Sequence, residues 1–293
     1  MEFNDLLTMA GLDPGTVAIA FHKSSTPKAR RAICTMADSD PLAFAAFQST
    51  HPAIQQATLA SRAFMASFVP AGDGEMTFVG MFRRRCQVPA STAQLAANDD
   101  FIRMLCTVNA ETPDVARPRV AGFADRLVFD LEPMAELRDF VGRLIVIDPG
   151  NRNYMRRAET THAPVIQITR LPHVAPEMPD WQDLELRAGE IGRLPREWAI
   201  RLAQWRGIYL IVDEDDGARY VGSAYGEDNL LGRWKAHVAG EFGVTRELAR
   251  RRTEGFRFSI LELTAPSADI SEVVNREHGW MHRLHTIEHG LNR

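Results

Sequence analysis

The first two-thirds of the chain mix short helical patterns with short apolar segments. Apolar runs bounded by turn residues predict strands over residues 65–69, 76–82, 126–131, 144–147 and 165–169. A short glycine-containing segment joins the first two runs, which favours a β-hairpin. A helix is expected over residues 42–48, because Asp40 can cap its first turn and Pro41 stands where a missing N–H is tolerated. Residues 1–175 therefore predict a domain of mixed helices and strands.

A proline-rich segment separates this region from the rest of the chain. Residues 171–179 contain Pro172, Pro176 and Pro179, and proline clusters are common in linkers. A short helix over 195–205 follows, and the remaining residues predict the order strand, turn, strand, helix, helix, strand, helix. The expected organisation is a first domain at 1–175, a linker with a lead-in helix at 176–205, and a final domain at 206–293.

The last predicted helix carries an acidic residue on its apolar side. At about 100° per residue, one face of this helix collects six apolar side chains, namely Ile270, Val273, Val274, Trp280, Met281 and Leu284. Glu277 falls in the middle of that face. A buried carboxylate without a partner is costly, so either a divalent cation or the guanidinium of Arg233 is expected beside it.

Composition and cysteine usage indicate a globular intracellular protein. The chain is 45% hydrophobic and 25% charged, and no apolar run is long enough to span a bilayer, so no membrane association is expected. The first residues lack the basic and apolar stretches of a signal peptide. Three scattered cysteines, Cys34, Cys86 and Cys106, fit a reducing cytosol and offer no zinc knuckle. A cytoplasmic location is expected.

The net charge of −4 argues against a protein that coats nucleic acid along its whole surface. A protein that acts on nucleic acid locally can instead concentrate positive charge in one groove. Two basic clusters exist: one at residues 83–85, and one in the final domain formed by Arg246, Arg250, Arg251, Arg252 and Arg257. Arg246 and Arg250–Arg252 are candidates for contact with nucleic acid. The alternative is an ordinary solvated face.

The predicted hairpin of the final domain carries two glycine–tyrosine motifs. Gly207-Ile208-Tyr209 begins the first strand, and Tyr220-Val221-Gly222 begins the second. On the helix that follows, Arg233 and His237 are four residues apart and project from the same side. A guanidinium can hold a phosphate while an imidazole handles a proton. Taken alone, the Arg–His pair is equally typical of an ordinary surface pair on an amphipathic helix.

Together these motifs resemble the GIY-YIG nuclease family over roughly residues 206–293. The GIY motif is intact, YVG stands for YIG, and Glu277 and Asn292 follow Arg233 and His237 in the family order. The resemblance implies an α+β fold, in which a small antiparallel three-stranded sheet flanked by helices holds one divalent metal ion.

The resemblance also implies roles for individual side chains. Glu277 would bind Mg²⁺ or Mn²⁺, and Tyr209 would be the general base for the attacking water, as a phenolate or through a relay with His237. Arg233 would neutralise charge on the phosphorane, and Tyr220 would position the phosphate or the water. A tyrosine base is demanding because its ordinary pKa is about 10.

Three further matched positions support the site without reacting: Gly207, Gly222 and Asn292, the last of which would be held near the site despite its place close to the chain end. One position departs from the family pattern. Phe242 stands near the place of a histidine found in many members. This departure favours an alternative function, a DNA-binding protein that retains the nuclease fold without efficient cleavage.

Four histidines near the end follow a helical spacing, namely His278, His282, His285 and His289. On one continuous helix they would form a stripe that could bind Zn²⁺ or Ni²⁺ or contact nucleic acid. The alternative is a polar helix face.

The sequence therefore predicts a metal-dependent DNA endonuclease that hydrolyses phosphodiester bonds in restriction or defence against foreign DNA. Its partner is DNA, and cutting both strands would favour a homodimer on DNA, because that reaction requires two active sites. The N-terminal region would read DNA, for which loops able to receive a flipped or modified base are one option. A domain for oligomerisation or protein contact is the other option.

Overall fold

The computed structural model describes residues 1–24, 26–72, 74–150, 153–175, 177–241 and 247–292. It divides into two compact units. The N-terminal unit comprises Met1–Asn109 and Pro113–Pro176, and the C-terminal unit comprises Ala110–Thr112 and Glu177–Arg293. Among the described helices, none has the length and apolar character needed to cross a membrane.

The N-terminal unit is organised around a sheet with the strand order β6–β1–β2–β3–β5–β7, and β4 also pairs with β3. These strands are β1 (Val17–Phe21), β2 (Phe64–Pro70), β3 (Glu75–Pro89), β4 (Leu127–Pro133), β5 (Leu144–Ile147), β6 (Met155–Arg157) and β7 (Val165–Ile168). The β1–β2 pair is parallel, and the other pairs are antiparallel. The long strand β3 pairs with β2 and β5 through its first half and with β4 through its second half.

The strands expected from the sequence at 65–69, 76–82, 126–131, 144–147 and 165–169 are all present, including the β2–β3 hairpin. The helix expected at 42–48 is α3 (Pro41–Gln48), and the Asp40 carboxylate accepts a hydrogen bond from the Ala43 N–H at 3.1 Å. The sequence analysis missed β1. All five of its residues are buried, so it lacks the alternation of apolar and polar residues that marks a half-exposed strand.

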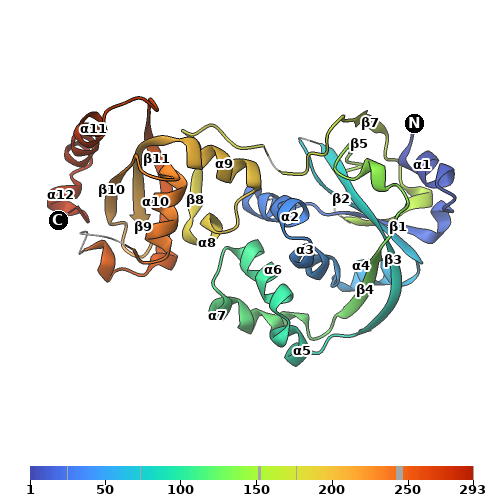
Figure 1. Ribbon diagram of the computed structural model, residues 1–293. Helices are drawn as coiled ribbons and strands as arrows, with labels where there is room; N and C mark the ends of the chain where they lie inside the picture. The colour runs from blue at the N-terminus through green and yellow to red at the C-terminus, as the bar shows by residue number, and fades with distance from the viewer. Residues whose placement is uncertain (25, 73, 151–152, 176, 242–246, 293) are drawn as a thin grey trace. The chain divides into compact units, whose positions relative to one another are not determined.

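Helices cover this sheet on both sides. They are α1 (Phe3–Met9), α2 (Pro27–Ser39), α3, α4 (Ala53–Ala60), α5 (Thr92–Ala97), α6 (Asp99–Asn109) and α7 (Pro113–Ala116). Figure 1 shows α2, α3 and α6 packed together, and their shared core contains Ile33, Phe44 and Leu105. Helix α1 packs against another part of the sheet, where the rings of Phe3 and Phe68 meet edge to face at 4.9 Å.

The C-terminal unit contains an antiparallel sheet with the order β10–β9–β11–β8. Its strands are β8 (Glu185–Arg187), β9 (Arg206–Asp213), β10 (Arg219–Ala224) and β11 (Phe256–Thr264). The three predicted strands are present. Strand β8, which comes from the segment expected to be a linker, adds a fourth through its pairing with β11.

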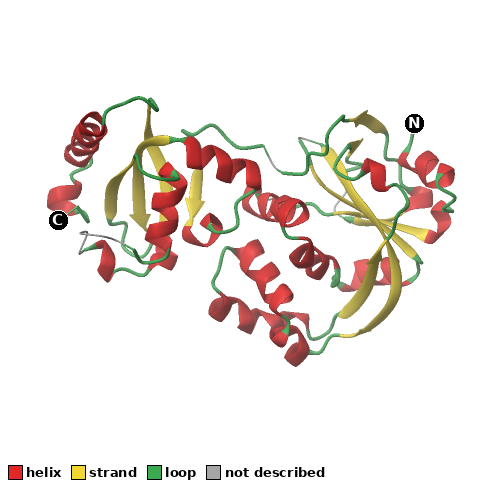
Figure 2. Ribbon diagram, viewed as in Figure 1, coloured by secondary structure: helices red, strands yellow, loops and turns green. Residues whose placement is uncertain are grey.

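The helices of this unit lie on both faces of the sheet, as Figure 2 shows for the C-terminal strands. They are α8 (Ala188–Ile191), α9 (Arg196–Gln204), α10 (Asn229–Val238), α11 (Ile270–Arg283) and α12 (Thr286–His289). Alternation along β9 assigns the faces. Tyr209 and Ile211 pack in the core that contains Trp234 of α10, whereas Ile208 packs with Val273 of α11.

The last predicted helix differs from expectation in two ways. Its apolar face does contact the sheet through Val273, but Ile270 at its first turn is 57% exposed. It also ends at Arg283, because His285 adopts a left-handed backbone with φ 54°. The four histidines therefore do not share one continuous helix, and all four are exposed. Among the described residues, no group of three or more His, Cys, Asp or Glu side chains is arranged to hold a metal ion.

Candidate active site

A buried tyrosine–histidine pair lies between the hairpin and α10. The Tyr209 hydroxyl oxygen lies 2.6 Å from Nε2 of His237, and both side chains are fully buried. His237 reaches this position because α10 carries it on the same apolar face as Trp234, which packs against the sheet. The spacing of Arg233 and His237 on one helix, expected from the sequence, therefore directs His237 toward β9.

Tyr220 joins this pair from the neighbouring strand. Its ring centroid lies 6.4 Å from that of Tyr209 and 5.6 Å from that of His237. Tyr220 pairs with Ile211 across the hairpin, so it shares the sheet face of Tyr209. The structure thus brings three of the predicted site residues into one aromatic cluster, which we call the tyrosine–histidine cluster (Tyr209, Tyr220 and His237).

The two glycines of the hairpin allow close approaches that a side chain would block. A Cβ added to Gly222 would lie 2.4 Å from the Tyr209 hydroxyl oxygen. A Cβ added to Gly207 would lie 2.1 Å from the carbonyl oxygen of Glu262, where the β9–β11 register shifts. Atoms at these separations overlap, so each position accepts glycine alone without movement of its neighbours.

Glu277 reaches the hairpin from α11. Its Oε2 atom accepts a hydrogen bond of 2.7 Å from the hydroxyl of Ser223, and its side chain is partly buried. Ser223 follows Gly222 in β10 and therefore faces α11, on the opposite side of the strand from the tyrosine–histidine cluster. The sequence analysis missed Ser223, whose sole signal was a hydroxyl within an otherwise apolar strand.

Arg233 links the two sides electrostatically. Its positive charge acts on Tyr209, on Tyr220 and on Glu277. No salt bridge joins Arg233 to Glu277 in the part of the chain that the structure describes, and both side chains are partly exposed. The alternative that Arg233 and Glu277 simply neutralise each other as a structural ion pair is therefore not supported.

Burial controls protonation throughout this site. It raises the pKa of Tyr209 well above its usual value; the nearby Tyr220 and Glu277 act in the same direction, and Arg233 acts against them. Burial, together with the charge of Arg233, lowers the pKa of His237 to about 4. Burial also raises the pKa of Glu277, against the opposing effects of Ser223, His278 and Arg233. At neutral pH, Tyr209 is therefore a neutral phenol beside a neutral imidazole.

The C-terminal segment is fixed to the exposed edge of β10. The Asn292 side chain accepts a hydrogen bond from the Val221 N–H at 2.9 Å and donates one to the Val221 carbonyl at 2.7 Å. The Leu291 N–H donates to the carbonyl of Arg219 at 2.8 Å. Asn292 thus continues the hydrogen-bond pattern of the sheet and covers a free strand edge.

The arginines expected to touch nucleic acid have different surroundings. Arg246 and the unusual Phe242 lie outside the described residues. Arg251 pairs with Asp213 at 3.0 Å and with Asp216 at 2.6 Å, so its charge is already neutralised. Arg250 is exposed and contacts Glu247 at 2.9 Å, and Arg252 is exposed.

Comparison with known proteins finds a family match for part of this chain. Residues 206–288 match the model of the GIY-YIG catalytic domain. The chain is also similar to two solved structures. One is the catalytic domain of intron endonuclease I-TevI in a mutant form, with 26% identity over 30% of this chain and 92% of that chain and a TM-score of 0.26. The other is the catalytic domain of homing endonuclease I-TevI, with 27% identity over 29% of this chain and 95% of that chain and a TM-score of 0.25.

No curated protein matches the chain. The family match covers the hairpin, α10, β11 and α11, and it contains every residue of the tyrosine–histidine cluster together with Arg233 and Glu277. The resemblance expected from the sequence is confirmed for residues 206–288 of the C-terminal unit, which match the model of the GIY-YIG catalytic domain.

Proposed function

We propose that the protein is a DNA endonuclease whose C-terminal unit hydrolyses phosphodiester bonds with the help of Mg²⁺ or Mn²⁺. The observation that carries this proposal is the 2.6 Å contact between Tyr209 and His237, within electrostatic reach of Arg233 and Glu277, inside a matched catalytic domain. This arrangement combines a proton relay, a fixed positive charge and a carboxylate. Each of these kinds of group can lower the barrier to phosphodiester hydrolysis.

Glu277 fits the part of a metal ligand. The Ser223 hydroxyl donates a hydrogen bond to Oε2 of Glu277. The Glu277 side chain is partly exposed, so its carboxylate remains accessible to a cation from solvent. A single carboxylate suits Mg²⁺, which keeps several waters and completes its shell with substrate phosphate oxygens. It does not suit a cage made of protein ligands alone, in agreement with the lack of a larger ligand cluster among the described residues. When bound there, the cation would stabilise charge on the leaving oxygen.

We assign the proton transfer to Tyr209 and His237 acting together. An isolated phenolate is unfavourable at this site because burial raises the pKa of Tyr209. A relay avoids that species: the attacking water gives its proton to the Tyr209 oxygen while the phenolic proton moves to Nε2 of His237. At pH 7 the imidazole is neutral, because its pKa is lowered to about 4, and in the tautomer that carries its proton on Nδ1 the Nε2 lone pair can accept the phenolic proton. The lowered pKa makes His237 a weak base, so it holds this proton only transiently.

The burial of Tyr209 places a condition on this mechanism. The side chain is fully buried, and its hydroxyl packs against Gly222. A water molecule therefore reaches the hydroxyl only after the hairpin moves locally, and we assign this step to substrate binding. Arg233, half-buried beside the cluster, would then hold the phosphate, and Tyr220 would orient it.

The remaining expectations concern biology and assembly. We propose that the N-terminal unit selects the DNA target and that cleavage serves restriction of foreign DNA in the cytoplasm. A homodimer on DNA would supply the two active sites that cutting of both strands requires. Cleavage assays on modified and unmodified phage DNA, with analytical ultracentrifugation of the DNA complex, test these two points.

The decisive experiment is cleavage of plasmid, linear and single-stranded DNA with Mg²⁺ or Mn²⁺, for the wild type and for Glu277→Ala. We expect metal-dependent cutting that the substitution reduces by about 10²–10³-fold, the scale of losing a main electrostatic group. Glu288→Ala is the matched control, because Glu288 is an exposed acid on α12.

If folded wild-type protein binds DNA but cuts no substrate with either metal, the proposal fails. That outcome would favour the second candidate, a DNA-binding protein that keeps the fold without efficient cleavage. The sealed position of Tyr209 is the observation that supports this candidate.

A further inference from the structure

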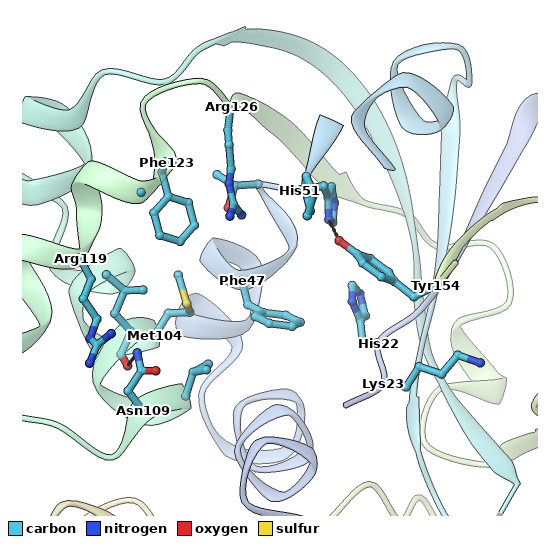
Figure 3. Close-up of a pocket in the computed structure, with 15 residues that line it drawn as sticks. His22, Lys23, Phe47, His51, Met104, Asn109, Arg119, Phe123, Arg126 and Tyr154 are labelled. Carbon is cyan, nitrogen blue, oxygen red and sulfur yellow. Dashed lines mark hydrogen bonds between the residues drawn. The ribbon is translucent and has the colours of Figure 1, made fainter. Parts of the chain in front are cut away.

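The N-terminal unit contains a cavity of about 460 Å³ that the nuclease chemistry does not use. Ligand pockets for small molecules start at roughly 300 Å³, so the cavity has room for one small heterocyclic ligand. Aromatic side chains form much of its wall, as Figure 3 shows for Phe47, Phe123, His22, His51 and Tyr154. None of the described residues that line it is an aspartate or glutamate. The cavity is therefore suited to a flat, neutral or anionic ligand.

Buried polar side chains line one side of this cavity and are held by further polar groups behind them. Nδ1 of His51 lies 3.0 Å from the Tyr154 hydroxyl, the contact that is dashed in Figure 3. His22 contacts Oε1 of Gln48 through Nε2 at 3.4 Å, and Ser67 donates to the same oxygen. These groups come from the end of β1, from α3 and the segment after it, from β2 and from the segment before β6. The fold thus gathers them from distant parts of the sequence.

One of these polar atoms lacks a partner. His51 is 2% exposed, and its Nε2 atom makes no hydrogen bond in the described structure. A buried polar atom in this state costs free energy unless a ligand or water satisfies it. Burial lowers the pKa of His51 to about 3 and that of His22 to about 4. Both rings are therefore neutral at pH 7, and Nε2 of His51 can donate or accept according to the tautomer.

The cavity is also lined by the positively charged side chain of Arg126, which pairs with no carboxylate among the described residues. The Arg126 guanidinium lies over the Phe123 ring at 4.2 Å, and none of the described acidic residues forms a salt bridge with it. Its charge acts on both His51 and Tyr154. The neighbouring Lys23, by contrast, is paired with Asp148 at 2.5 Å. A partly buried arginine with no counter-ion provides a favourable position for a phosphate group.

We infer that this cavity binds a single nucleotide, with its base held against Phe47 and Phe123, a polar edge of the base at Nε2 of His51, and its phosphate at Arg126. Base stacking on aromatic side chains contributes substantially to affinity and accepts any base. A polar contact to the base edge adds selectivity. The nucleotide has two sources: one flipped out of a DNA strand, or a free mononucleotide. This inference stands independently of cleavage by the C-terminal unit.

The test measures binding by the full-length protein in EDTA, so that no cleavage occurs. Isothermal titration calorimetry with the four deoxynucleoside monophosphates tests the free ligand. A duplex with a mismatched 2-aminopurine, whose fluorescence rises when the base leaves the stack, tests the flipped nucleotide. Binding by either source supports the inference, and the two experiments distinguish the sources.

Variants localise the binding to the cavity. Arg126→Gln should weaken it by about tenfold or more, since it removes a charge-assisted hydrogen bond. Arg138→Gln is the matched control, because Arg138 is exposed and does not line the cavity. Val108→Trp should also reduce binding, because it fills the cavity from α6 and leaves His51, Tyr154 and Arg126 unsubstituted.

Circular dichroism establishes that each variant is folded. The inference is overturned if the wild type binds none of the monophosphates and leaves 2-aminopurine quenched. It is equally overturned if binding is unchanged in both Arg126→Gln and Val108→Trp.

Discussion

The two units each contain a tyrosine hydrogen-bonded to a neutral histidine, with an arginine close by. In the C-terminal unit, Tyr209 contacts His237 at 2.6 Å, and in the N-terminal unit, Tyr154 lies 3.0 Å from His51. Burial lowers the pKa of both histidines, to about 4 for His237 and about 3 for His51. The two tyrosine–histidine pairs are therefore chemically similar. Any difference in their roles must come from the side chains around them.

Those surroundings differ in one decisive group. Glu277 acts electrostatically on Tyr209 and offers a ligand for a divalent cation. The N-terminal cavity, as far as the described residues show, has no carboxylate in its lining and instead offers volume and aromatic walls. A tyrosine–histidine pair next to a carboxylate is suited to moving a proton during hydrolysis. The same pair next to an aromatic cavity is suited to binding. Tyrosine and histidine alone therefore do not identify an active site.

The strongest test exchanges each tyrosine for phenylalanine. Tyr209→Phe should lower kcat by about 10²–10⁴-fold, the usual contribution of a general base, with little change in DNA affinity. Tyr154→Phe should leave kcat unchanged and weaken nucleotide binding, since it frees Nδ1 of His51 to reorient. Single-turnover cleavage and calorimetry measure the two effects.

Tyr225→Phe is the control for the first substitution, because Tyr225 is 39% exposed and follows β10. The distinction between the two pairs is lost if Tyr209→Phe cuts DNA at the wild-type rate, or if Tyr154→Phe reduces kcat as strongly as Tyr209→Phe.

Acid should separate the units by their buried histidines. A histidine with an ordinary pKa of 6.5 in the unfolded chain and about 4 in the folded protein stabilises the fold fully above pH 6.5. This stabilisation is lost as the pH falls from 6.5 to about 4, because the unfolded chain then binds more protons, and it amounts to about 3 kcal/mol per histidine. The N-terminal unit buries His22 and His51, whereas the C-terminal unit buries His237. We therefore expect the N-terminal unit to unfold at the higher pH.

The distribution of tryptophan makes this measurable. All five tryptophans lie in the C-terminal unit, at positions 181, 198, 205, 234 and 280, so their fluorescence follows that unit alone. Far-UV circular dichroism follows both units and should begin to fall at a higher pH than tryptophan fluorescence. His51→Gln should move that first transition toward lower pH. Coincident transitions in both signals would show that the histidines do not set the order of unfolding.

The success of sequence analysis also differs between the units. In the C-terminal unit, the hairpin motifs and the Arg233–His237 spacing are local patterns, so their elements and the family were predictable. Strand β8 was not, because its three residues bury only Leu186. Ser223 was not either, because its partner Glu277 is 54 positions away. A serine within a strand has no special meaning until the contact is known.

In the N-terminal unit, the strands with alternating or bounded apolar runs were predictable, whereas the cavity was not. His22, His51 and Tyr154 come from separate segments and share no spacing motif. The sheet brings them together because β6 pairs with β1, so that the residue before β6 reaches the end of β1. Contacts formed by strand order across more than a hundred residues leave no local signature in the sequence.

Packing around the two pairs offers the third test. The Tyr209 hydroxyl lies against Gly222, so Gly222→Ala would place a methyl group 2.4 Å from that oxygen. Overpacking of this kind should destabilise the C-terminal unit by about 1–3 kcal/mol, and tryptophan fluorescence during urea unfolding would report it. Gly279→Ala on α11 is the control, and its effect on the free energy of unfolding should have the opposite sign. A Cβ added at Gly279 has no neighbouring atom within 4 Å, so alanine should stabilise the helix by about 1 kcal/mol. Equal stability of the two variants would show that the Tyr209–His237 pair has room for an added methyl group, in the same way that the His51–Tyr154 pair lies beside a cavity.

The edges of the two sheets provide the finest comparison. In the N-terminal unit, the edge strand β7 leaves Ile166 and Ile168 more than 40% exposed. In the C-terminal unit, the edge strand β10 is covered by Asn292, which forms two hydrogen bonds with the Val221 backbone. Asn292→Ala should cost about 1–2 kcal/mol and loosen the strand that carries Tyr220 and Ser223. Hydrogen exchange at the Val221 amide should accelerate, whereas Asn275→Ala, at an exposed position of α11, should leave it unchanged. Unchanged exchange in Asn292→Ala would mean that this edge is as open in solution as that of β7.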